Sequence, residues 1–220
     1  PVLSLMNPKL TFSVPSEQKA FGIADMMSHI FERYFTNTRD VMLSDELCEG
    51  VLRTIIQSGL KAIQHQDDYA SHADLMWAGT LAHNNTLSPG REQDWSCHRI
   101  GSAISAHYDA PHGGVLAVLF PHWMRYQLDH DKDRFARFAV KVMGVKKDAG
   151  DAQQLAHEGI NRLAGFFHSL GLKDKLSDYG MKEDDLLMIA RDAPYNDEGT
   201  VGNFRPLNQD DVLAIYRLAL

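Results

Sequence analysis

A short break at residues 108–111 divides two apolar segments of helical character, and this corner constrains the fold more than any other feature of the chain. Before the break, apolar residues recur at the spacing of a mostly buried helix, and after it residues 113–119 suit a second apolar helix. Pro111 favours a helix start there, because its missing N–H would have no intrahelical partner in the first turn. Two helices that meet at such a corner can direct His98 and His112 toward one point.

Most of the remaining sequence also has helical periodicity, interrupted by Gly and Pro. Ser16 and Ser44 are predicted N-caps, and convincing strand alternation does not occur beyond the first dozen residues. The further predicted helices are 20–35, 44–63, from Asp67 or Ser71 to about 84, 131–143, 149–170, 182–192 and 209–219. Residues 1–15 hold three prolines and are predicted to be extended, while 84–90 and 193–208 suit loops. The fold class expected is all-α, a multi-helix bundle.

Composition excludes several kinds of partner. The 220 residues carry a net charge of −7, whereas a nucleic-acid interface would need clustered Lys and Arg. No apolar run approaches the length of a membrane span, and no charged-then-apolar leader is seen at the start. Cys48 and Cys97 lie in predicted helices without a pairing pattern, which favours a reducing compartment. We therefore expect a cytoplasmic protein that binds neither nucleic acid nor membrane.

Asp25, His29, His98 and His112 form a candidate set of one carboxylate and three imidazoles. Asp25 and His29 are spaced i,i+4, so both side chains lie on one face of the predicted 20–35 helix. Such a donor set suits a divalent transition metal. By spacing alone the ordinary alternatives remain open: an Asp–His pair at this spacing is often a surface ion pair, and a His beside an apolar helix is often a hydrogen-bonded core residue.

The flanking residues resemble those of the iron-containing alcohol dehydrogenases, particularly the butanol-dehydrogenase-like branch. The resemblance rests on GIADMMSHIFERYF at 22–35 and on His98 followed by YDAPHGGVLAVLFP at 108–121, and it extends over nearly the whole chain. It implies that Asp25, His29, His98 and His112 bind a catalytic Fe(II) or Zn(II). It also implies an NAD(P)-dependent oxidoreductase that interconverts alcohols and aldehydes or ketones, with a homodimer as one option for its assembly.

Members of this family also have an N-terminal α/β domain whose glycine-rich turn holds NAD or NADP. No comparable glycine cluster follows a strand in this sequence. The resemblance thus implies that residues 1–15 lead in from a missing nucleotide-binding domain and that 16–220 form the helical metal-binding domain. This fragment alone is expected to be inactive, its cofactor-binding residues are not assigned, and no catalytic residue is assigned beyond the metal ligands. Many relatives place a second histidine four residues after the His98 equivalent, where this chain has Ser102, and we do not transfer that role to His107.

Two other functions are weighed against this expectation. His130-Asp131 is the dipeptide of HD-type metal phosphohydrolases, which are also helical, although it lies in a charged connection that is expected to be solvated. The third alternative is a non-catalytic helical module with structural histidines. Among the other histidines, His83 and His122 could line the site. His65, His72, His157 and His168 are predicted to be surface residues.

Overall fold

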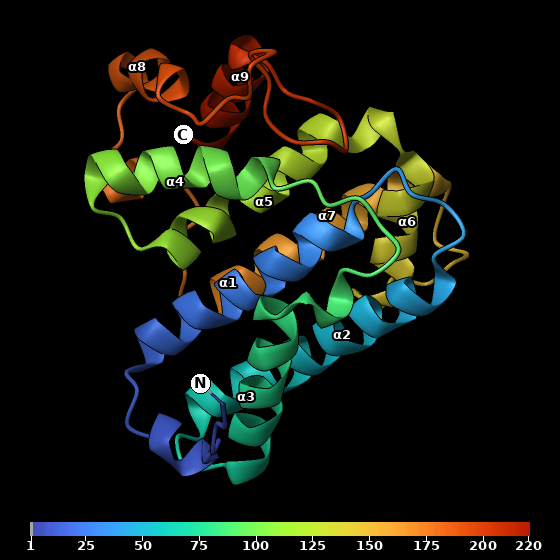
Figure 1. Cartoon of the computed structure of the whole chain (residues 1–220), viewed down its shortest axis with the longest axis vertical. Coiled ribbons are helices and arrows are strands. Elements are labelled where there is room, and N and C mark those ends of the chain that lie inside the picture. Colours follow the sequence, from blue (N-terminus) through green and yellow to red (C-terminus); the bar gives the residue numbers. More distant parts are fainter. Residues whose placement is uncertain (1) are drawn as a thin grey trace.

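The computed structural model describes residues 2–220 and confirms the all-α prediction, because that range contains helices and a single isolated β-bridge. The α-helices are α1 (Ser16–Tyr34), α2 (Met42–Gln64), α3 (Tyr69–His83), α4 (Ser96–Tyr108), α5 (His112–Gln127), α6 (Lys132–Lys141), α7 (Ala152–Ser169), α8 (Leu186–Arg191) and α9 (Gln209–Ala219). Short 3-10 helices are Pro8–Thr11, Asn85–Leu87, Leu128–His130, Leu176–Tyr179 and Glu183–Asp185. In Figure 1, α1 crosses the middle of the molecule, with α2 and α3 on one side and α4, α8 and α9 on the other.

Helix α1 is the central element of the core. Its apolar positions recur at helical spacing, so Ile23, Met27, Phe31 and Tyr34 are all fully buried. It packs against α2, α3, α4 and α5. Ser16 is its first residue and not its N-cap as predicted, because Pro15 occupies the cap position without a side-chain bond.

The start of the chain is more compact than predicted. Residues 8–11 form a 3-10 helix in place of an extended segment, because Asn7 caps it by accepting a hydrogen bond from the Lys9 amide at 3.1 Å. The Thr11 hydroxyl then lies 2.6 Å from Nδ1 of His72 on α3. The prediction that His72 is a surface residue is wrong, since only 2% of it is exposed.

Several helix boundaries also differ from the predictions. Helix α2 begins at Met42, two residues before the predicted cap Ser44. Helix α5 continues to Gln127 through the buried Pro121, because Trp123 and Met124 beyond it are buried in the core. The predicted 182–192 helix is divided between a 3-10 turn and α8.

No helix among residues 2–220 is both long enough and apolar enough to span a bilayer. This holds for α5 as well, although most of its residues are buried in the core.

The α4–α5 corner brings the start of α5 against α1. Asp109 ends α4 in the left-handed region at φ 49°, and Pro111 occupies the N-cap position of α5 without a side-chain bond, so that the helix begins at His112. The next glycine, Gly113, lies directly on the backbone of Phe21, so that a Cβ at position 113 would overlap the Phe21 carbonyl group. Only glycine permits this approach, which places His112 beside the middle of α1.

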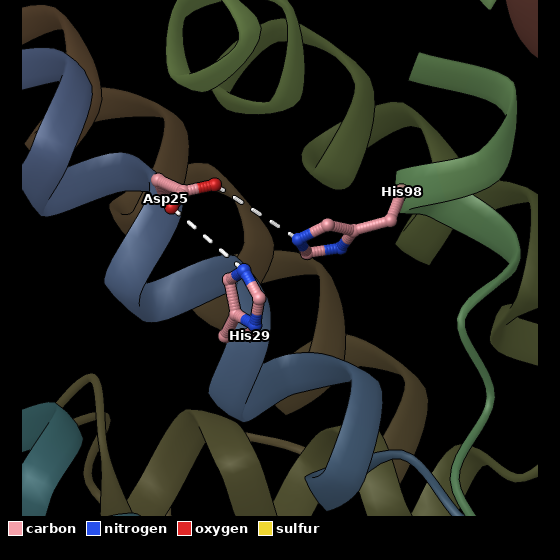
Figure 2. Close-up of side chains that lie close together, drawn as sticks. All are labelled: Asp25, His29 and His98. Carbon is pink, nitrogen blue, oxygen red and sulfur yellow. Dashed lines mark ion pairs between the residues drawn. The ribbon is translucent and has the colours of Figure 1, made fainter. Parts of the chain in front are cut away.

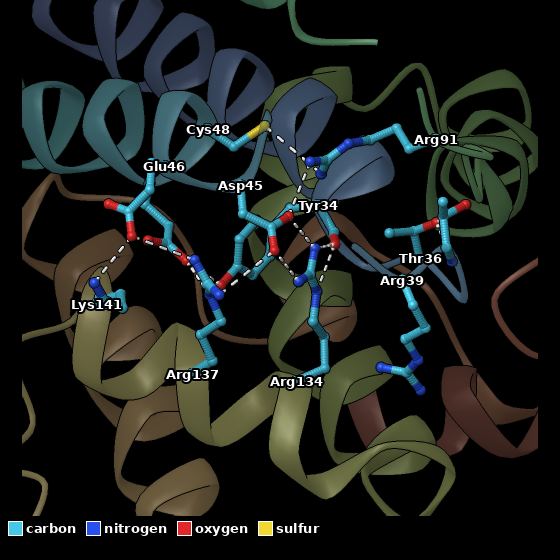
Figure 3. A network of polar contacts seen from close by, with 12 residues as sticks. Tyr34, Thr36, Arg39, Asp45, Glu46, Cys48, Arg91, Arg134, Arg137 and Lys141 are labelled. Carbon is cyan, nitrogen blue, oxygen red and sulfur yellow. Dashed lines mark hydrogen bonds and ion pairs between the residues drawn. The ribbon is translucent and has the colours of Figure 1, made fainter. Parts of the chain in front are cut away.

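At its C-terminal end, α1 is held by buried arginines (Figure 3). Arg134 donates from Nε to the Tyr34 carbonyl oxygen at 2.8 Å, and Arg91 donates from Nη1 to the Arg33 carbonyl oxygen at 3.0 Å. Helix C-termini leave carbonyl groups without intrahelical partners, and these cations satisfy two of them. Both guanidinium groups also bind the Asp45 carboxylate of α2, at 2.6 Å for Arg134 and 2.9 Å for Arg91. Burial raises the pKa of Asp45, but the surrounding arginines outweigh it and the pKa is lowered.

Gly113→Ala should destabilise the fold by about 2 kcal/mol, because the added methyl group meets backbone that has to move. The matched control is Gly22→Ala on α1, where a Cβ would meet nothing within 4 Å and Ala favours the helix. Urea unfolding of both variants gives the comparison. Equal stability of the two would contradict the close approach of α5 to α1.

Asp45→Asn should cost about 3 kcal/mol of unfolding free energy, since it leaves two buried arginines without their counter-ion. The pKa of Asp45 is lowered in the fold, so its contribution is present above its unfolded pKa of about 3.9 and is lost as pH falls through the lower folded value. The difference between the native chain and the variant should therefore shrink below about pH 4. The exposed Glu46→Gln, which also removes a carboxylate from α2, is the control and should change stability little.

Candidate metal centre

Asp25 on α1 lies between the three histidines that the sequence grouped with it. Its Oδ1 is 3.9 Å from Nε2 of His98 and 4.0 Å from Nε2 of His112, while its Oδ2 is 3.8 Å from Nε2 of His29. Figure 2 shows the Asp25 carboxylate and the rings of His29 and His98 directed toward one another from α1 and α4. The structure thus brings all four candidate residues to one place.

The arrangement is tightest for three of the four. Donor atoms of Asp25, His29 and His98 all lie within 4.8 Å of one another. His112 lies at the edge of the group, with 37% of its side chain exposed and its ring centroid 5.4 Å from that of His98. Ligand bonds of about 2.1 Å set neighbouring donors roughly 3.0–3.4 Å apart, so a small inward movement of the side chains would close the set around an ion.

The polar atoms that face the centre of this group include two buried ones without a hydrogen-bond partner. These are Oδ1 of Asp25 and Nε2 of His98, which find no partner among residues 2–220. Buried polar atoms are usually paired, and leaving one unpaired costs on the order of 1–3 kcal/mol. Their positions fit a metal ion, which would bind both atoms from between them.

The imidazoles are in the protonation state that a metal requires. Burial, followed by the nearby His98, lowers the pKa of His29 to about 4, and burial lowers the pKa of His98 to about 4. Burial and His98 also lower the pKa of His112. Metal binding needs neutral imidazole, and these shifts keep the rings neutral near pH 7.

Glu32 follows His29 by about one turn of α1 and fixes the orientation of His98. Its Oε1 accepts hydrogen bonds from the His98 amide at 2.8 Å and from Nδ1 of the same ring at 2.9 Å. When the proton is on Nδ1, the free lone pair of the ring is on Nε2, the nitrogen that faces Asp25. A carboxyl group behind a histidine is a common device for fixing a metal-binding tautomer. Burial raises the pKa of Glu32 to about 8, although hydrogen bonds from His98 and Trp95 oppose this shift. Glu32 is then mostly protonated near pH 7, and its Oε1 still accepts both bonds when the proton is on Oε2.

Asp94 and Trp95, which precede α4, fix the position of His98. Asp94 is buried, and its Oδ1 accepts the amides of Asn203 and Phe204 at 2.7 and 2.8 Å, which ties this segment to the irregular stretch before α9. Trp95 follows with a left-handed φ of 64°. Its indole packs on His29 and His98, with ring centroids 5.3 and 5.1 Å away, and thereby covers one side of the candidate centre.

His83 is the residue that sequence reasoning did not place in the group. Its Nε2 is 3.0 Å from Oδ2 of Asp25, and its ring centroid is 4.3 Å from that of His29. The sequence suggested only that His83 could line the site, and no local pattern connects it with Asp25, which is 58 residues away in the chain. His122, the other histidine considered there, lines a separate cavity of about 450 Å³ with Arg125 and Lys173.

Ser102 and His107 do not face the centre. The Ser102 hydroxyl donates to the His98 carbonyl oxygen at 2.8 Å, within its own helix. His107 pairs with Asp192 through Nε2 at 2.8 Å and has no contact with Asp25.

The phosphohydrolase alternative is not supported by the structure. Nε2 of His130 lies 2.9 Å from the Asn37 side-chain oxygen, and its ring packs on Phe204. Asp131 caps α6 by accepting from the Arg134 amide at 3.0 Å and also pairs with Arg39. Both residues connect elements of the fold, and neither contributes to the candidate group described by the structure.

The fold and the site together define an all-helical domain with a carboxylate–histidine cluster on its central helix. The model of the Fe-containing alcohol dehydrogenase family, C-terminal, matches residues 19–220. The chain therefore belongs to the iron-containing alcohol dehydrogenase family, in which it corresponds to the C-terminal domain.

Among its relatives is the probable NADH-dependent butanol dehydrogenase 2 of Bacillus subtilis, 42% identical over all of this chain and 57% of that protein. NADH-dependent butanol dehydrogenase A of Clostridium acetobutylicum is 41% identical over 99% of this chain and 56% of that protein. The crystal structure of NADH-dependent butanol dehydrogenase A from Thermotoga maritima superposes with a TM-score of 0.89 at 34% identity, covering 96% of this chain and 54% of that one. The chain thus spans little more than half the length of the relatives it matches.

Proposed function

We propose that this chain is the metal- and substrate-binding part of an NAD(P)-dependent oxidoreductase that interconverts alcohols with aldehydes or ketones. The proposed ligands are Asp25, His29, His98 and His112, and the proposed ion is Fe(II) or Zn(II). The observation that carries the proposal is the pair of buried, unpartnered atoms Asp25 Oδ1 and His98 Nε2, which face each other at 3.9 Å. Butanol dehydrogenase relatives at about 40% identity support the reaction class.

The ion, when bound, supplies Lewis acidity that polarises a substrate oxygen. In this proposal the residues of the chain bind the ion, orient its ligands and exclude water from one side. Three neutral imidazoles and one carboxylate suit a transition metal better than Mg(II), which prefers oxygen ligands and retains water. Glu32 orients His98, and Trp95 keeps water from one side of the cluster. His112, the most exposed of the three histidines, borders the side from which a small alcohol would enter.

We place the cofactor mainly outside residues 1–220. This part of the proposal rests on the 56–57% share of the butanol dehydrogenases that the chain covers and on the lack of a glycine-rich dinucleotide turn in its sequence. Residues 1–15 would then connect a nucleotide-binding domain to the helical domain at 16–220. The choice between NAD and NADP follows from that other domain.

The proposal includes a reducing, cytoplasmic setting and a homodimer. Cys48 and Cys97 are both buried and free, which suits a reducing compartment. Leu47 and Trp77 are about half exposed and line one groove between α2 and α3, which supports association with another apolar surface. Sedimentation analysis of the purified protein would measure its assembly.

Zinc titration of the metal-free protein should show one tight site. His112→Ala should lower its zinc affinity by about 100-fold or more, because the substitution removes a residue that binds the metal directly and not one that only orients a ligand. Asp25→Asn should lower the zinc affinity by a similar factor. His168→Ala is the matched control, since it removes an exposed histidine that pairs with Asp174 at 2.9 Å away from the cluster. Unchanged zinc affinity in Asp25→Asn and His112→Ala would overturn the proposed ligand set, and tighter binding of Mg(II) than of Zn(II) would do the same.

The 220-residue chain alone should bind metal but show no dehydrogenase activity. Hydride transfer needs the nicotinamide in van der Waals contact with the substrate carbon, and this chain offers no turn that would hold it there. The measurement is absorbance of NADH or NADPH with metal and short-chain aldehydes. Turnover similar to that of a full-length relative would show that the nicotinamide is bound within residues 1–220.

A further inference from the structure

We propose that His83 is a positioning residue of the metal site, which holds Oδ2 of Asp25 by a hydrogen bond and so presents Oδ1 to the ion. This inference rests on the proposed function, because it concerns how the ligand Asp25 is oriented. His83 lies at the end of α3, 58 residues along the chain from Asp25.

The two oxygens of Asp25 have different surroundings. Oδ2 is 3.0 Å from Nε2 of His83, and since a carboxylate only accepts hydrogen bonds, the imidazole is the donor. Oδ1 is buried, lacks a partner among residues 2–220, and is the oxygen closer to His98 and His112. Because Oδ2 is hydrogen-bonded, rotation of the Asp25 carboxylate is restricted. The lone pairs of Oδ1 therefore point in a fixed direction.

The ring of His83 is itself fixed. Nδ1 lies 2.7 Å from the Gly79 carbonyl oxygen one turn earlier in α3, and the ring packs on His29 with centroids 4.3 Å apart. Both nitrogens thus face acceptors, and because a neutral imidazole has one N–H, the two bonds form together only in the doubly protonated ring. Outer groups that orient ligands in this manner typically change metal affinity 10- to 100-fold when they are removed.

The geometry favours positioning over direct ligation. His83, like His112, lies outside the compact donor group formed by Asp25, His29 and His98, so membership of that group does not separate the two roles. The hydrogen bond does: His83 occupies Oδ2 at 3.0 Å, whereas the unpartnered Oδ1 lies nearest His98 and His112. His29 also faces Oδ2, but from 3.8 Å. With 43% of its side chain exposed, His83 is also expected to matter little for folding, so its removal tests the site and not the core.

The test is zinc affinity, measured by calorimetric titration of the metal-free protein, for His83→Leu and His83→Gln. His83→Leu should bind zinc about tenfold more weakly, because Asp25 loses its donor. His83→Gln should restore most of the affinity, since the amide N–H reaches about as far as Nε2 but does not readily bind zinc. The control is His168→Leu, which removes another exposed His–Asp pair and should leave affinity unchanged. The melting temperature of each metal-free variant checks that folding is retained.

The outcomes separate this inference from the function on which it rests. Equal zinc affinity of the native chain and His83→Leu would overturn the role of His83 alone. A loss in His83→Gln as large as that in His83→Leu would overturn positioning in favour of direct ligation. A native chain that binds no zinc at all would overturn the proposed function and this inference with it.

Discussion

The close contact of α5 with α1 at Gly113 and Phe21 is the constraint on which the arrangement of the site depends. Because position 113 has no side chain, the start of α5 lies directly on the backbone of the central helix. His112 is thereby brought within 4.0 Å of Asp25 from a helix that begins far away in sequence. The same α5 then continues into the core, so the position of His112 is coupled to the packing of much of the domain.

The central helix carries buried charge at two places, and the two are satisfied differently. At its C-terminal end, Arg91 and Arg134 bind carbonyl groups of α1 and share the Asp45 carboxylate, so opposite charges are paired there (Figure 3). Arg91 Nε and Glu49 Oε2 still lack a partner among the described residues. In its middle, Asp25 Oδ1 and His98 Nε2 also lack a partner within residues 2–220, but these two atoms face each other at 3.9 Å. Buried unpartnered atoms that converge on one point are the kind of exception expected at a functional site. This contrast is why the middle of α1, and not its end, is the part we assign to chemistry.

Several partners outside the cluster determine how it is shaped. Glu32 fixes the His98 ring, Asp94 anchors the segment before α4 to the stretch before α9, and His83 contacts Asp25 from α3. None of these three follows from a local pattern, since each bond joins segments that are far apart along the chain. Their combined effect is that α1, α3 and α4 each contribute to the direction in which a metal-binding atom points.

The sequence by itself determined the helical class, most of the helix cores and the set Asp25, His29, His98 and His112. It could do so because helical periodicity and i,i+4 spacing are local properties of the chain, and because the flanks of these residues resemble a known family. Only the tertiary structure decided four other features. They are the additional hydrogen bonds of His83, the burial of His72, the extension of α5 past Pro121, and the arginines that hold the end of α1. Each depends on which distant backbone or side chain lies opposite, and that is set by packing between helices, which no local pattern records.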